Sequence, residues 1–179
     1  GTIESTGDMI VGGTGNLVVQ NNQGISFANH SHATGMHSEL LDDYEEGSWT
    51  PDPKVAGTSR PGSETSYGTY IKIGGFVHVI GSVSVNRGTN DGTFSIAGLP
   101  FAESATAISS NNPGGGVINI RPNDFMTWNN FSGQVGSTTM SFYGNPGSTI
   151  GALSSLSAST FINASVNVVF IVSASYFSI

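Results

Sequence analysis

Four carboxylates lie within five residues of this chain, at Asp42, Asp43, Glu45 and Glu46. Because Ca²⁺ takes about six to eight oxygen ligands, such a cluster is one way to hold a hard cation. A pair of carboxylates is also the machinery of glycoside hydrolysis. The same segment holds residues that would anchor it to a core, namely Leu40, Leu41, Tyr44 and Trp49. We therefore favour a structural turn whose carboxylates face water over cation binding and over catalysis.

A second candidate is the pair His30 and His32, separated by one serine. Side chains on an extended segment alternate, so both imidazoles would point to one side. Around the axis of a homotrimer they would supply six nitrogens, which suits an octahedral transition-metal ion. The neighbouring residues are small and polar, and the plainer interpretation is a surface loop. No other cofactor is expected.

A third group has the chemistry of sugar binding, which combines an aromatic face with amides and charged groups. Trp128, Asn130 and Tyr143 offer the aromatic faces and an amide, and Arg121 and Asp124 lie near Trp128 in sequence. The alternative is that the aromatic rings belong to the core. We keep these five residues as candidates for contact with a carbohydrate receptor.

The composition indicates an all-β protein. Charged residues make up 9% of the 179 residues, and the chain carries 25 glycines, against roughly 25% charged residues in an average soluble domain. Glycine and small polar residues are poor in helix interiors but suit turns and strand faces. The five basic residues are too scattered to bind nucleic acid. With no cysteine and no Gly-x-Ser-x-Gly motif, we expect neither disulfides nor an enzyme.

Alternating apolar residues predict several strands. The clearest is 76–85, where Val77, Val79, Val83 and Val85 share one face. A hairpin turn is predicted at 87–92 and a loop at 53–66. Further strands are expected at 8–11, 16–20, 24–28, 93–96, 117–121, 125–131, 138–143 and 163–178.

The last of these strands is partly apolar on both faces, which is typical of a strand that is central in a sheet or lies at a subunit interface. About eight strands with this spacing suit a β-sandwich or jelly roll. The longest apolar stretch, at 166–172, is far shorter than the ~20 residues of a membrane span, so no membrane insertion is expected.

The first part of the chain predicts oligomerisation. Its short strands are too poor in apolar residues to bury a core alone, and no disulfide can staple them. We expect residues 1–45 to form a neck in which three chains intertwine, and residues 46–179 to form a β-sandwich head. The chain begins abruptly inside strand-like sequence, so we expect a fragment of a longer polypeptide.

Residues 40–51, Leu-Leu-Asp-Asp-Tyr-Glu-Glu-Gly-Ser-Trp-Thr-Pro, resemble the LDDYEEGTWTP motif of bacteriophage tail-fibre and related virion proteins. Ser48 replaces the usual threonine. The strand-like segments 15–19 and 24–28, the segment 67–74 and the Gly-Leu-Pro-Phe of 98–101 resemble other parts of this family, in the same order. The motif residues in this chain are Leu41, Asp42, Asp43, Tyr44, Glu45, Glu46, Gly47, Trp49 and Pro51.

The resemblance implies an extracellular virion protein: the receptor-binding tip of a phage tail fibre. Such a protein would be a homotrimer, would contact other tail proteins and would adsorb to a carbohydrate on the host cell surface. A polysaccharide-degrading tailspike fragment is one alternative. A purely structural fibre or decoration domain without a receptor is another.

Overall fold

The computed structural model describes residues 17–20, 23–27, 34, 40–41, 43–104, 117–122, 131–144, 154–160, 162 and 167–178. The chain divides into two compact units, which we call the N-terminal unit (Gly1–Asp42) and the two-sheet unit (Asp43–Ile179). No helix among these residues has the length and apolar character needed to cross a membrane.

The described part of the N-terminal unit contains one antiparallel pair of short strands, β1 (Ile25–Ser26) and β2 (Leu40–Leu41). The predicted strand 24–28 overlaps β1. Residues 17–20 are not a strand, and the predicted strand 8–11 lies outside the described residues. The large apolar side chains described in this unit are between 38% and 82% exposed, and they are Leu17, Val18, Val19, Ile25, Phe27, Leu40 and Leu41.

The first sheet of the two-sheet unit is antiparallel, with the strand order β3-β6-β7-β13-β9. Its strands are β3 (Tyr44–Trp49), β6 (Tyr67–Ile73), β7 (Phe76–Val85), β13 (Val168–Phe177) and β9 (Val117–Pro122). The predicted strand 76–85 matches β7. β13 lies between β7 and β9, so a strand that is apolar on both faces is indeed internal to its sheet.

The second sheet is also antiparallel, with the order β10-β11-β8-β4-β5, and β12 pairs with β11. Its strands are β4 (Asp52–Val55), β5 (Thr58–Ser59), β8 (Phe94–Ala97), β10 (Phe131–Gly136), β11 (Thr139–Gly144) and β12 (Ser154–Ser155). A 3₁₀ turn, η1, covers Ala158–Thr160. The predicted strand 125–131 overlaps β10 at one residue, and residues 123–130 lie outside the described part.

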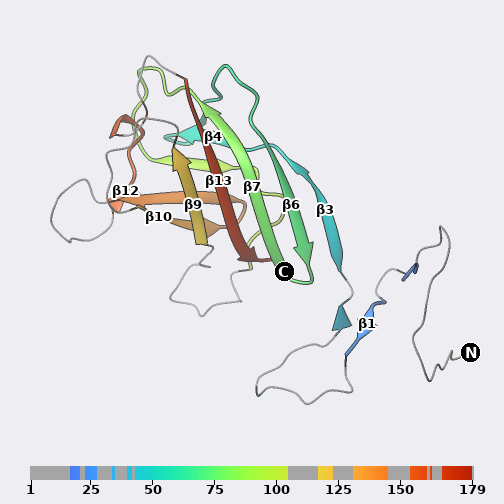
Figure 1. The fold of residues 1–179 in the computed structure, drawn as a ribbon. Coiled ribbons are helices and arrows are strands. Elements are labelled where there is room, and N and C mark those ends of the chain that lie inside the picture. Colours follow the sequence, from blue (N-terminus) through green and yellow to red (C-terminus); the bar gives the residue numbers. More distant parts are fainter. Residues whose placement is uncertain are drawn as a thin grey trace, which may run out of the picture. The chain divides into compact units, whose positions relative to one another are not determined.

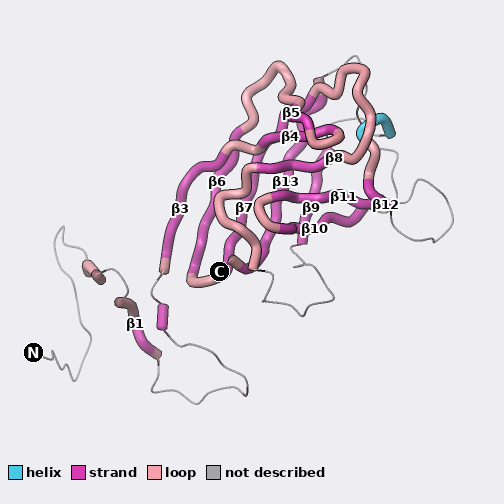
Figure 2. Tube along the Cα trace, turned by 180° about the vertical axis from the view of Figure 1, so that it is seen from behind, coloured by secondary structure: helices cyan, strands magenta, loops and turns pink. Residues whose placement is uncertain are grey.

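The two sheets form two layers, and the strands of one layer run across those of the other (Figure 1). In the view from behind, the second sheet lies nearer the viewer (Figure 2). This crossing is the orthogonal arrangement of packed sheets. The all-β prediction is confirmed. The jelly-roll topology and the trimer stay predictions.

The core lies between the two layers. The four valines predicted on one face of β7 are fully buried, and they meet side chains from the second sheet. Phe94 of β8 joins the layers, since its ring centroid lies 5.4 Å from that of Phe142 in its own sheet and 5.8 Å from that of Phe170 in the first sheet. Period-2 alternation therefore places one side of each sheet in a shared interior.

Two local predictions were wrong. The expected loop at 53–66 contains the hairpin β4–β5, because Ala56 and Gly57 both adopt positive φ (49° and 76°) and close a two-residue turn. The turn at 87–92 does not form a hairpin, because β7 belongs to the first sheet and β8 to the second. Turn residues indicate that the chain reverses, but they do not indicate which sheet receives the next strand.

Candidate functional site

The motif at residues 40–51 contributes the edge strand β3 of the first sheet, instead of the predicted turn. Trp49 is buried, and its Nε1 donates to the backbone oxygen of Ile80 at 3.2 Å. Its ring lies against Gly68 and Gly81, which pair across β6 and β7. A Cβ at Gly68 would overlap Trp49 Nε1, and one at Gly81 would lie 3.1 Å from the indole. The glycines are therefore the floor on which this tryptophan packs.

The described carboxylates of the motif each have a protein partner. Asp43 forms an ion pair with Lys72, a buried lysine whose Nζ lies 5.5 Å from the centroid of the Phe101 ring. Tyr70 donates its hydroxyl hydrogen to Glu45, and the hydrogen bond to this carboxylate raises the pKa of Tyr70. Tyr44 donates to Glu46 at 2.9 Å in the same way, and its pKa is also raised.

These acids are consistent with a structural role. Among the described strands, β3 pairs only with β6, so its other edge is open. Charged side chains on an edge strand discourage other chains from adding to the sheet. In the part of the chain that the structure describes, no three His, Asp or Glu side chains come close enough to hold a metal ion.

Only some of the candidate metal and receptor residues belong to the described part of the chain. His30, His32, Asp42, Asp124, Trp128 and Asn130 lie outside the described residues. Arg121 belongs to β9, where its backbone pairs with that of Ile171. Tyr143 is half-buried on β11, opposite Ser132 and Ser155. These two candidates lie on strands of different sheets.

A polar groove of about 460 Å³, which the sequence patterns did not predict, joins segments far apart in the chain. The side chain of Asn167 organises it. Its Oδ1 accepts hydrogen bonds from the backbone nitrogen of Ser63 (3.2 Å) and from Asn86 Nδ2 (3.1 Å), and its Nδ2 donates to Ser63 Oγ at 2.8 Å. The groove is lined by Ser59, Arg60, Pro61, Gly62, Ser63, Asn86, Gly88 and Asn167.

Arg60, which lines this polar groove, also has a buried donor without a partner. Its Nε is buried and, within the described part of the chain, is the side-chain nitrogen or oxygen that lacks a hydrogen-bond partner. Buried polar groups normally have a partner from protein, water or ligand. Ser63 and Asn167, which meet in the groove, are 104 residues apart in sequence, so no local pattern could have revealed it.

A second groove, of about 420 Å³, shares Pro61, Gly62 and Ser63 with the first. It adds two carboxylates, Asp52 and Glu64. Burial raises the pKa of Asp52, but hydrogen bonds from Ser59 and Lys54, together with the charge of Lys54, outweigh it and lower that pKa. The two grooves together present hydroxyls, amides, a guanidinium and carboxylates, which are the donors and acceptors that bind sugar hydroxyls.

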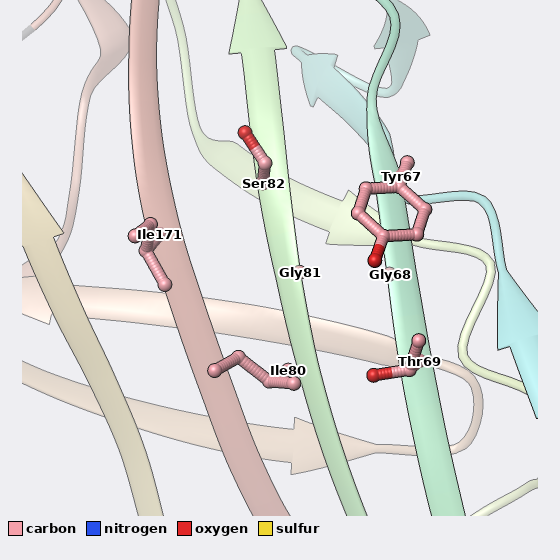
Figure 3. A pocket seen from close by; sticks show the side chains of 7 residues that line it. All are labelled: Tyr67, Gly68, Thr69, Ile80, Gly81, Ser82 and Ile171. Atoms are coloured by element: carbon pink, nitrogen blue, oxygen red, sulfur yellow. The ribbon is translucent and has the colours of Figure 1, made fainter.

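The outward side of the first sheet is a different kind of surface, which we call the apolar face. It carries the exposed large side chains Tyr44, Tyr67, Ile71, Ile73, Phe76, Ile80, Ile171 and Phe177. Near its middle is a hollow of about 210 Å³, where Tyr67, Ile80 and Ile171 project on the side away from the second sheet (Figure 3).

No model of a known protein family matches this chain, and a search of curated proteins finds no match either. The fold and the surfaces define an antiparallel two-sheet β protein with a polar groove and an apolar face.

Proposed function

We propose that this protein is the receptor-binding tip of a bacteriophage tail fibre: a non-enzymatic homotrimer that adsorbs to a carbohydrate on the host cell. The N-terminal unit would be its neck and the two-sheet unit its head. The motif at residues 40–51 supports this assignment through its resemblance to virion proteins. Trp49 and Lys72 also give that motif a structural role in the head.

The observation that carries the proposal is the state of the N-terminal unit. The seven large apolar side chains that are described in this unit are all exposed in the single chain, and its described strands are two residues long. Such strands cannot bury a core by themselves. Intertwining with sister copies would give these side chains an interior, as in a fibre neck.

The polar groove is the receptor site that we propose for the head. Arg60, Asn86 and Asn167 offer a guanidinium and two amides in one hollow, and the guanidinium would donate to a sugar oxygen or carboxylate. Three heads on one fibre would turn weak sugar binding into firm adsorption, since later contacts are intramolecular.

The test is binding of the full chain to purified lipopolysaccharide and capsular polysaccharide from a panel of bacteria. We expect a subset of these glycans to bind, with Arg60→Ala weakening binding by about tenfold, the effect of one charge-assisted hydrogen bond. Lys54→Ala removes an equal charge from a residue that pairs with Asp52 of the second groove and does not line the polar groove, so it should bind as the parent does if the polar groove is the receptor site. No binding to any glycan, together with failure to block phage adsorption, would instead favour a structural fibre domain.

One observation favours the tailspike alternative enough to test it. Asp52 and Glu64 line the same groove, and glycosidases act through two carboxylates. Incubation with bound polysaccharide should release no reducing ends if the protein is an adhesin. Release that disappears in Glu64→Gln would make the chain an enzyme.

A further inference from the structure

The apolar face collects every exposed large apolar or aromatic side chain that the described part of the two-sheet unit has. Strand register places these eight residues on one side. Tyr44, Ile73, Phe76 and Phe177 form one row across four strands. Tyr67 and Ile171 flank Ser82 in another row, six residue pairs further along the strands.

We infer that the apolar face is buried against other copies of this chain, so that the heads associate face to face around the axis of the assembly. This inference rests on the homotrimer of the proposed function and adds to it a second contact, separate from the neck. The partner is thus the same surface on a second copy of the chain.

The area of the face suits a stable contact. A large side chain offers roughly 200 Å², and these eight are between 42% and 62% exposed. Together they present roughly 800 Å² of apolar surface, about what each partner buries in a standard interface. The largest apolar patch of a typical monomer is only ~300–600 Å².

The charge of the face favours a copy over a different partner. Among the outward side chains described on β3, β6, β7 and β13, the face has one carboxylate, Glu46, and one imidazole, His78. Glu46 accepts a hydrogen bond from Tyr44, and His78 Nδ1 lies 2.8 Å from Ser175 Oγ on the same face. A face without opposite charges to satisfy can meet itself without repulsion. Apart from Glu46, its described outward side chains include none of the amides and carboxylates that orient a sugar.

The shape of the face also favours a second copy of the chain as the partner. The hollow between Tyr67, Ile80 and Ile171 has room for a projecting side chain, and the rows on either side of it supply such projections. Four of the large residues lie on β3 and β6 and four on β7 and β13. Around a threefold axis, one half of each face would therefore meet the other half of its neighbour. A ring of this kind is built from heterologous contacts, so it requires two different parts of one surface that are complementary to each other.

Single cysteines test the inference directly, because the chain has none of its own. Ile171→Cys and Thr69→Cys place a thiol on the apolar face, and Ser132→Cys places a control thiol on the exposed side of the second sheet. The full chain is labelled with a maleimide while sedimentation reports its mass. We expect the two face thiols to react at roughly a tenth of the control rate or slower, since labelling then needs local opening or dissociation.

The outcomes separate this inference from the proposed function. A trimer whose three thiols react at similar rates would overturn the face-to-face contact and leave the neck trimer and the adhesin in place. A single copy in solution would overturn both the contact and the trimer. Slow labelling at both face positions supports the contact, even in a protein that binds no glycan and so fails as an adhesin.

Discussion

The outer faces of the two sheets differ in a way that their inner faces do not. Both inner faces are apolar and meet in one core. The outer face of the second sheet, which we call the polar face, carries Asp52, Lys54, Ser95, Gln134 and Ser141. The outer face of the first sheet carries eight exposed apolar or aromatic side chains instead.

This contrast separates two patterns of side chains along a strand: that of a sheet with one face in water and that of a sheet covered on both faces. A sheet with one face in water alternates apolar and polar residues, as β8 and β4 do in the second sheet. β13 of the first sheet has Phe170 and Val172 inside and Ile171 and Phe177 outside. A chain that keeps large apolar residues on a water-facing side loses solubility without gaining core. The first sheet therefore has the pattern of a sheet covered on both sides.

The largest expected effect comes from a charge in the middle of the apolar face. In Ile80→Glu, a carboxylate would enter the contact without a partner, and burying it costs several kcal/mol unless the copies separate. We expect the association constant of the full chain to fall by about 100-fold or more, measured by sedimentation over a range of concentrations.

The matched change on the polar face is Ser141→Glu, which lies between Gln134 and Ser95 in register. We expect no change in mass, because that face stays in water. If both variants lowered the association constant equally, net charge and not the apolar face would control association. The two outer faces would then not differ in function.

Part of this architecture could be predicted from the sequence. The regular alternation in 76–85 predicted both the strand and its buried valines, because residues two apart along a strand lie on the same face. The polar groove could not be predicted, since Asn167 meets Ser63 only after β13 has returned beside β7. The acidic motif could be read as a cation site or as a turn, because only the pairing of β3 with β6 brings Asp43 to Lys72.

A smaller effect is expected inside the first sheet, where a glycine floor supports Trp49. In Gly68→Ala, the new methyl group would overlap the indole nitrogen and approach the backbone oxygen of Ile80 to 2.7 Å. We expect the free energy of unfolding to fall by about 2–3 kcal/mol, as for other overpacked cores. Denaturant unfolding of the variant measures this loss.

The second sheet offers a control for that substitution. A Cβ at Gly136 of β10 would have no atom within 4 Å, so Gly136→Ala should change the unfolding free energy by less than about 0.5 kcal/mol. If Gly68→Ala were equally mild, Trp49 would be free to move, and the motif would not hold the first sheet in the way described.

The smallest effect is a pH dependence confined to the turn between the sheets. Asp91 accepts hydrogen bonds from the Ser157 hydroxyl, from the backbone nitrogen of Ser159 (3.1 Å) and from that of Gly92 (2.8 Å). These bonds hold the pKa of Asp91 well below its usual range. Because the unfolded-state pKa is about 3.9, the carboxylate stabilises the fold above that pH, and the contribution is lost as the pH falls towards the folded-state pKa.

The corresponding variant is Asp91→Asn, which should melt at a lower temperature than the parent at pH 7. The difference in melting temperature between parent and variant should shrink between pH 4 and pH 2.5. In this range the unfolded parent takes up a proton at Asp91, so the stabilisation by the carboxylate falls. Association through the apolar face, followed by light scattering at the same pH values, should be the same for parent and variant, because Asp91 lies in the turn and not on that face. A deficit that stays constant down to pH 2.5 would show that Asp91 acts through turn geometry alone, without a contribution from its charge.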